Sequence, residues 1–170
     1  MPLDDLNPRF RSLTAALLEE LPDASLPDAV QQHVFIKIGE QPEREAEILA
    51  SLPGGVQAVY ASMIVDAQVQ NGGFNQFFWN SARFADLALK GLEELGAHEH
   101  ARVLRQAMEV AIAERDRLLP YHVEGSIQAF SGSYREGVFD DLDTLYYNLP
   151  ALDGILARSI RDHPERFASP

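Results

Sequence analysis

The residues in this chain best suited to metal binding are two histidines, His98 and His100, with Glu99 between them. Histidines that chelate a metal from one helix are spaced by four residues, so that both rings lie on one face. A spacing of two separates the rings by about 200°, and the carboxylate between them does not correct this. The chain also has no cysteine, which excludes disulfides, thiolate metal sites and a cysteine nucleophile. The sequence therefore predicts no metal site and no cofactor.

Catalytic motifs are missing as well. There is no Gly-x-Ser-x-Gly nucleophile elbow, and no glycine-rich loop that leads into Lys-Ser or Lys-Thr to hold a phosphate. The pair Gly72-Gly73 lacks the third glycine and the flanking strand of a dinucleotide site. Carboxylates are plentiful, but acid–base catalysis needs two of them to meet in a cleft, which spacing alone does not establish. We expect a protein that is not an enzyme.

Side-chain amides flank this glycine pair and form a second kind of candidate site. Asn71, Gln76 and Asn80 stand next to phenylalanines and Trp79, a combination that can orient a small ligand in a pocket. Alternatively, the amides satisfy backbone groups that a broken helix would release. The first interpretation predicts a concave, part-exposed site beside the glycines, and the second predicts amides paired to the backbone.

The formal net charge of -12 carries the clearest functional information. So acidic a surface repels nucleic acid and anionic membranes and favours basic partners. An acidic surface also keeps a protein in solution, and carboxylates at a helix start gain from the helix dipole, so neither feature requires a partner. The candidate partner-binding carboxylates are Glu19, Glu20, Asp23, Glu40, Glu43 and Glu47.

The glycine pair must also position the amides. Glycine reaches positive φ at little steric cost, so Gly72-Gly73 after an amphipathic run predicts a helix stop and a sharp change of direction. Phe74, Phe77 and Phe78 follow at spacings that place three rings on one helical face. We predict a bent helix that buries these rings in the core.

A β-hairpin is the rival interpretation of the same stretch. Asn71-Gly72 between alternating residues is a strong hairpin signal. The apolar residues between Val56 and Ala67, however, follow helical spacing over a longer window, and we give the longer pattern more weight.

Helical spacing continues through the rest of the chain. Start signals, prolines and glycines bound the predicted helices at 7–22, 25–39, 42–53, 55–70, 80–96, 98–120, 140–149 and 150–163. Ile112, Arg115 and Leu119 are assigned to the inner face of the sixth helix. Residues 120–138, rich in glycine and serine, are predicted to form a loop or a short irregular element. A short helix within this stretch is the alternative.

No segment alternates as a strand would, so the predicted fold is a single all-α bundle of about seven to eight helices. Residues 1–50 supply N-terminal helices and residues 51–167 the core. Three positions have local predictions: His33 is a hydrogen-bonded core histidine, Gly91 allows close helix–helix approach, and Phe167 folds back as an anchor.

The chain start, Met1-Pro2-Leu3-Asp4-Asp5, lacks the basic and apolar segments of a signal peptide. No run approaches the ~18 apolar residues that a membrane span requires. We expect a soluble, cytoplasmic protein without a membrane partner.

The run Asn71-Gly72-Gly73-Phe74, with Gln76-Phe77-Phe78 and Asn80-Ser81, resembles the signature of the bacterial DNA-mimic protein family, long catalogued as a domain of unknown function. The likeness covers roughly residues 50–167, although Ala82-Arg83-Phe84 replaces the small turn expected after the signature. Further agreement is found at Leu52-Pro53, Val59-Tyr60, Leu95-Gly96-Ala97, Phe139-Asp140-Asp141-Leu142-Asp143 and His163-Pro164-Glu165-Arg166-Phe167.

The resemblance implies an all-α homodimer without catalytic activity, in which surface carboxylates stand in for DNA phosphates on the DNA-binding face of a basic transcription regulator. No partner-contacting acid of a characterised relative is carried over to a position of this chain, so the six carboxylates above rest on charge pattern alone. Two alternatives remain: a small-ligand-binding protein or enzyme with its pocket beside Asn71-Gly72-Gly73-Phe74, and an immunity-type partner of a neighbouring gene product.

Overall fold

The computed structural model describes residues 6–168; residues 1–5, whose composition argued against a signal peptide, lie outside them. Throughout that range every regular element is a helix and no strand occurs, which confirms the all-α prediction and excludes the hairpin. The α-helices are α1 Ala15–Glu20, α2 Leu26–Ile38, α3 Glu45–Ala50, α4 Gly54–Ser81, α5 Ala85–Glu94, α6 His98–Ala113, α7 Arg115–Glu124, α8 Ile127–Ser133, α9 Asp140–Tyr147 and α10 Leu152–Asp162. Short 3-10 turns are η2 Pro8–Arg11, η3 Asp23–Ser25, η4 Pro42–Arg44, η5 Ala82–Phe84, η6 Tyr134–Glu136 and η7 Pro164–Arg166.

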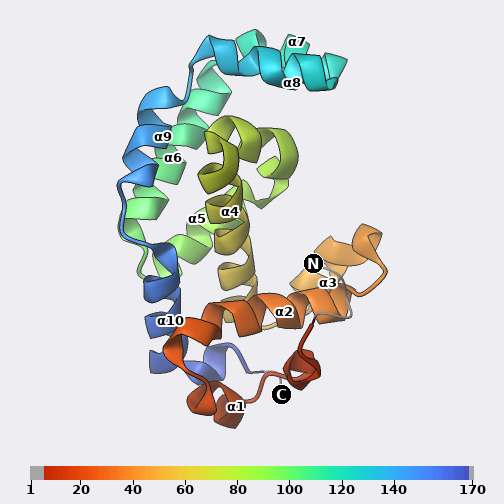
Figure 1. Cartoon of the computed structure of the whole chain (residues 1–170), viewed down its shortest axis with the longest axis vertical. Helices are drawn as coiled ribbons and strands as arrows, with labels where there is room; N and C mark the ends of the chain where they lie inside the picture. The colour runs from red at the N-terminus through yellow and green to blue at the C-terminus, as the bar shows by residue number, and fades with distance from the viewer. Residues whose placement is uncertain (1–5, 169–170) are drawn as a thin grey trace.

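Helix α4 is the central element of the bundle (Figure 1). It packs against α5, α2 and α9, while α6 joins α5 to α9 and α10 packs on α2. Val56, Val59, Val65 and Val69 of α4 are fully buried, because neighbours cover the helix on several sides. None of the helices in residues 6–168 is long and apolar enough to cross a membrane.

The contact between α4 and α5 depends on a glycine. A Cβ added to Gly91 would lie 2.9 Å from the Cα of Ala58, closer than side-chain carbons approach backbone. The prediction that Gly91 allows close helix approach is confirmed. Phe167 is fully buried, and a Cβ at Gly55 would meet its ring at 2.8 Å, so the predicted C-terminal anchor is also confirmed.

The predicted bend lies inside α4. Gly73 has φ 68° and ψ -176°, a conformation essentially restricted to glycine, whereas Gly72 at φ -163° is extended backbone that any residue adopts. The rings of Phe74 and Phe77 are fully buried and Phe78 is half-buried. The aromatic wedge is therefore confirmed, with one of the two glycines requiring the special backbone.

Two N-terminal predictions merged separate elements. The predicted helix 7–22 is η2 followed by α1, because the hydroxyl of Thr14 accepts the Leu17 N–H at 3.1 Å and starts a new helix. The predicted helix 42–53 is η4 followed by α3, which ends at Ala50. His33 is buried and its Nδ1 lies 2.7 Å from the Phe10 carbonyl oxygen, as predicted for a core histidine.

The sixth predicted helix is wrong in its second half. α6 ends at Ala113, and Pro120 lies inside α7 instead of terminating a helix. Ile112, Arg115 and Leu119 are exposed, not inward-facing, with Ile112 at 75%. The chain turns at Glu114, so α7 runs in a new direction at one end of the bundle, beside α8 (Figure 1).

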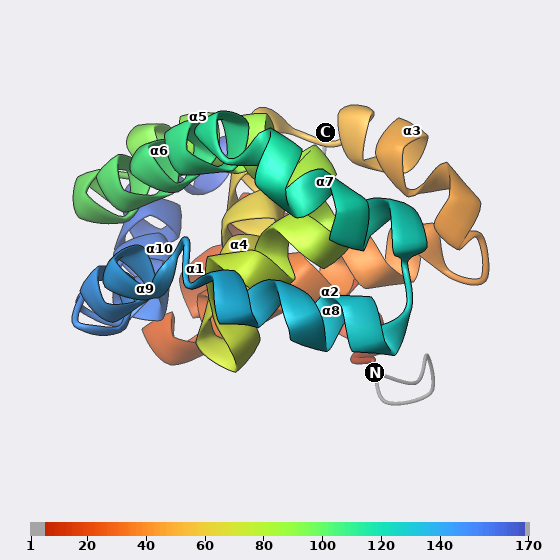
Figure 2. The same ribbon diagram turned by 90° about the horizontal axis from the view of Figure 1, so that it is seen from above.

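Residues 120–138 contain a helix where a loop was the main prediction. α8 begins after Ser126, whose hydroxyl accepts the Ala129 N–H at 3.0 Å, and it runs beside α7 (Figure 2). Gly125, at φ 64°, allows the sharp turn between the two helices. α7 and α8 together form a hairpin, named here the α7–α8 hairpin. Downstream, α9 is confirmed, and α10 starts at Leu152 instead of Pro150.

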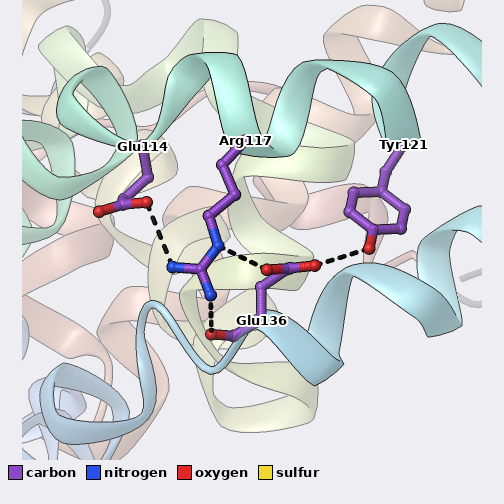
Figure 3. A network of polar contacts seen from close by, with 4 residues as sticks. All are labelled: Glu114, Arg117, Tyr121 and Glu136. Atoms are coloured by element: carbon purple, nitrogen blue, oxygen red, sulfur yellow. Dashed lines mark hydrogen bonds and ion pairs between the residues drawn. The ribbon is translucent and has the colours of Figure 1, made fainter.

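A polar cluster ties this hairpin to the segment that follows it (Figure 3). Arg117 donates from Nε to the Glu136 carboxylate, from Nη2 to the Glu136 carbonyl at 3.2 Å, and from Nη1 to Glu114 at 3.4 Å. The Tyr121 hydroxyl donates to the other Glu136 oxygen at 2.7 Å. These contacts join α7 to η6 at the solvent-exposed edge of the molecule.

Candidate functional site

The broken helix is completed by side chains from the C-terminal part of the chain. The hydroxyl of Tyr134 donates to the Gly72 carbonyl at 2.8 Å, and that of Tyr147 donates to the Val69 carbonyl at 3.0 Å. Both carbonyls lie near the break, where the backbone N–H groups that would bond to them in a continuous helix are no longer in place. The prediction that the flanking amides satisfy the freed backbone groups is therefore wrong, since tyrosines do so.

Asp143 supplies the third contact. Its Oδ1 accepts the backbone N–H of Phe74 at 2.7 Å, the first donor after the break. A Cβ on Gly73 would lie 2.2 Å from this carboxylate, so the site excludes any side chain there. Burial raises the pKa of Asp143, and the Phe74 N–H opposes that rise by stabilising the charged form.

The three candidate amides form a network with one another. Asn71 donates to Gln76 at 2.9 Å, and both Gln76 and Asn80 donate to Oε1 of Gln68 at 3.0 Å. Gln68 was not among the sequence candidates, because it lies on the other side of the bend and shares no helical spacing with Asn80. The bend brings them together on the surface, where Asn71 and Asn80 are exposed.

A hollow of about 320 Å³ opens beside this network. Its walls include Asn71, Gln76, Asn80, Trp79 and Phe130. The indole of Trp79 stacks on the His122 ring at 4.6 Å and contacts the Phe130 ring at 5.1 Å, which fixes the aromatic wall. The concave site expected by the small-ligand interpretation is therefore present, at the junction of α4 and the α7–α8 hairpin.

The six candidate carboxylates form two groups instead of one. Glu19, Glu20 and Asp23 lie on α1 and η3, before α2; the other three lie beyond its far end, on and around α3 (Figure 1). A helix of thirteen residues separates the groups, a length of roughly 20 Å.

Local cations neutralise half of these carboxylates. Glu20 pairs with Arg9 at 3.3 Å, Asp23 with Arg161 at 2.8 Å and Glu47 with Arg44 at 2.9 Å. The remaining three, Glu19, Glu40 and Glu43, are exposed and have no ion-pair partner between residues 6 and 168. Their charge is the most available to a partner.

The two histidines considered for metal binding point in different directions, as their spacing predicts. His98 is exposed, and His100 is buried with its ring edge-on to Tyr146 at 5.3 Å. Burial lowers the pKa of His100, with the nearby Asp66 acting in the opposite direction. Within the described range, no cluster of three or more histidine, aspartate or glutamate side chains is placed to hold a metal.

Comparison with known proteins places the chain in a family. A family model described as DMP19-like protein matches residues 50–163, which include the Asn-Gly-Gly-Phe bend and α9. The chain belongs to the DMP19-like family. No curated protein and no solved structure matches it. Membership thus covers the bend, the amide network and the hollow, while α1, α2 and most of α3 lie outside the match.

Proposed function

We propose that this DMP19-like protein is a non-catalytic interaction protein that captures a basic partner and occupies its DNA-binding face in place of DNA. The observation that carries the proposal is a surplus of uncompensated negative charge on the surface. Exposed carboxylates without an ion-pair partner within residues 6–168 outnumber the exposed cations in the same state. The carboxylates are Glu19, Asp28, Glu40, Glu43, Asp86, Glu109, Asp116, Glu124, Asp140, Asp141, Asp153 and Asp162; the cations are Arg11, Lys37, Arg115, Arg135 and Arg158.

The spacing of the two carboxylate groups supports this proposal. A DNA strand carries one phosphate per about 3.4 Å of axis, so the roughly 20 Å between the ends of α2 corresponds to about six phosphate steps. Glu19 at one end and Glu40 with Glu43 at the other can therefore meet separate basic patches on one partner. The family name is consistent with such a role.

A competition experiment tests the proposal. The protein is immobilised, partners are captured from lysate of the source organism and eluted by a salt gradient, and the eluted protein is purified. Capture should weaken steeply with salt, because it rests on exposed charges. In a gel-shift assay, the free protein should displace duplex DNA from the purified partner. A partner with no affinity for DNA, such as a secreted toxin, would instead support the immunity-type alternative.

A matched pair of variants separates local from general charge. Glu19→Gln/Glu40→Gln/Glu43→Gln should weaken capture by about tenfold or more, from three lost charge contacts. Glu109→Gln/Asp116→Asn/Glu124→Gln removes the same net charge from unpaired carboxylates of α6 and α7 and should leave capture close to wild type. Equal losses in both variants would mean that net charge alone attracts the partner. Capture that is indifferent to salt would refute the proposal.

A homodimer is part of the proposal, and an exposed apolar strip supports it. Val123 at 77% and Ile127 at 79% exposure lie with Leu119 on the α7–α8 hairpin, where burial against a second copy would remove apolar surface from water. Sedimentation velocity should show a dimer in the wild type and a monomer in Val123→Lys/Ile127→Lys. A dimer that survives this substitution would place the interface elsewhere.

Small-ligand binding at the hollow beside the bend is the second candidate function. It is favoured by the exposed amides and by the aromatic wall. Trp79 is the only tryptophan of the chain, so its fluorescence reports on this site alone. Titration with neutral sugars, nucleosides and amides should change that fluorescence in the wild type and not in Asn80→Ala. The absence of any response across the panel would remove this candidate.

A further inference from the structure

An apolar groove of about 210 Å³ lies between α3 and the start of α5, away from the bend. Its walls are formed by Ala46 and Leu49 of α3 and by Phe84 and Leu87 of η5 and α5. Leu49 and Phe84 are buried at its base, while Ala46 is exposed at its edge. α3 makes its main contacts with α2 and η4, so it borders α5 without packing closely against it.

The base of the groove is held by aromatic packing. The ring of Phe84 meets Tyr60 edge-on with centroids 6.0 Å apart, and Tyr60 meets Phe35 in the same way at 5.9 Å. Such edge-to-face contacts fix ring orientation in a core. The groove is therefore part of the folded bundle and not a gap left by a moving segment.

A half-buried carboxylate is among the residues that line the groove. Glu45, only 18% exposed, accepts the Tyr60 hydroxyl at 2.6 Å and the Arg83 guanidinium at 2.6 Å. The guanidinium of Arg83 also lies 4.7 Å from the centroid of the Phe84 ring. Its positive charge is thus compensated by Glu45, so it does not repel a cationic partner at this edge.

The uncompensated charge around the groove is negative. Glu43, just before α3, and Asp86, in the first turn of α5, are exposed and lack an ion-pair partner in the described part of the chain. Arg44 is paired with Glu47. Asp86 directly precedes Leu87, and Glu43 stands two positions before Glu45, so unpaired carboxylates adjoin both segments that line the groove. Such a groove complements a segment that carries one apolar side chain between lysines or arginines.

We propose that this groove anchors a leucine-, methionine- or phenylalanine-sized side chain from a basic amphipathic helix of the partner. The inference rests on the proposed function and adds to it, because charge would attract the partner and the groove would retain it. A volume of about 210 Å³ accommodates one such side chain. Buried apolar anchors dominate the energetics of many interfaces, while exposed charges act mainly on the association rate.

Two labelled model peptides test the inference without knowledge of the natural partner. One is a helical peptide of lysine and leucine with its leucines on one face, and the other replaces every leucine by alanine at equal charge. Fluorescence anisotropy should show that the leucine peptide binds the wild type about tenfold more tightly or better, the gain expected for burying one leucine. Methyl resonances of Leu49 and Leu87 should shift with the leucine peptide only.

Filling the groove should remove this preference. Ala46→Trp and Ala50→Trp place an indole at the groove from exposed positions of α3, whereas Ala113→Trp makes the same change at the exposed end of α6. The first two should bind both peptides equally and the third should behave as wild type, with circular dichroism confirming that all three are folded. A tenfold preference that persists in both groove variants would overturn the inference.

The outcome also separates this inference from the proposed function. If both peptides bind the wild type equally and release with salt, the groove is not an anchor and the proposal of acidic capture stands. If neither peptide binds at low salt, acidic capture and the anchor fail together.

Discussion

The bend in α4 and the α7–α8 hairpin are both held by polar side chains, yet their surroundings are opposite. At the bend, Asp143 and Tyr147 reach backbone groups 69 and 78 positions away in sequence, around fully buried Phe74. At the hairpin, Arg117 and Glu136 are 19 positions apart and meet at the surface (Figure 3).

Burial decides what each set of contacts contributes. A buried backbone donor that loses its acceptor keeps its desolvation cost, whereas an exposed ion pair that is broken returns to water. We therefore expect changes at the bend to lower the stability of the whole bundle, and changes at the hairpin to act locally.

Gly73→Ala should have the largest effect. Its backbone lies in a region open essentially to glycine alone, and the added Cβ would lie 2.2 Å from the Asp143 carboxylate. We expect a loss of about 3 kcal/mol or more in the free energy of unfolding, measured by urea titration. The Phe74 ring would be displaced together with the backbone.

Gly96→Ala is the matched control for this substitution. Gly96 has φ 82°, but a Cβ there would meet nothing within 4 Å. It should cost only about 1 kcal/mol, the price of the left-handed backbone alone. Equal losses in the two variants would show that the contact with Asp143 is unimportant, and would weaken the contrast between the bend and the hairpin.

Asp143→Ala should come next, with a loss of about 2 kcal/mol, because it leaves the Phe74 N–H without an acceptor. Asp143→Asn keeps an acceptor oxygen and removes a charge whose burial is unfavourable, as the raised pKa indicates. It should therefore unfold close to wild type. If alanine and asparagine destabilise equally, the carboxylate acts by its charge and not by this hydrogen bond.

Much of the bend could be predicted from local sequence, because its requirements are local. Gly73 next to Phe74 and Phe77 signals positive φ followed by a buried helical face, and both features are observed. Asp143 could not be identified in the same way. In the sequence it cannot be distinguished from other carboxylates in the first turn of a helix. Its role depends on a contact with Phe74, 69 positions away in the sequence.

The hairpin could not be predicted from local sequence. Ile112 and Leu119 follow the same apolar periodicity as the buried residues Ala101 and Leu104 of α6, so spacing assigned them all to one inner face. Periodicity identifies an apolar stripe but not what covers it. The chain turns at Glu114, so Leu119 no longer continues the inner face of α6, and the residue at this position gives no sequence signal of the turn.

Acidification should lower the stability of the bundle through two buried histidines. Burial lowers the pKa of His33 and of His100 from the value near 6.5 that they have in the unfolded chain, so the fold favours their neutral forms. The unfolded state then binds more protons as the pH falls below about 7, and stability falls with it. We therefore expect a lower free energy of unfolding at about pH 5.5 than at about pH 7.5.

Urea titrations at the two pH values measure this loss, and His33→Gln/His100→Gln should reduce it. Asp66 opposes the trend at lower pH, because burial raises its pKa and the fold then gains from its protonation. If the wild type and His33→Gln/His100→Gln lose the same stability between the two pH values, the fold does not favour the neutral forms of these histidines.

Glu136→Gln should have the smallest effect on the whole molecule. Glu136 accepts from Tyr121 and Arg117, and these contacts lower its pKa, but they lie at the surface where water and salt screen them. We expect an unchanged melting temperature and faster amide exchange confined to α7 and α8, measured by hydrogen–deuterium exchange with mass spectrometry. Glu165→Gln, which breaks the exposed pair with His163, is the control and should leave exchange in the hairpin unaltered. A fall in melting temperature with Glu136→Gln would mean that the hairpin unfolds together with the bundle, so that burial would no longer distinguish the two regions.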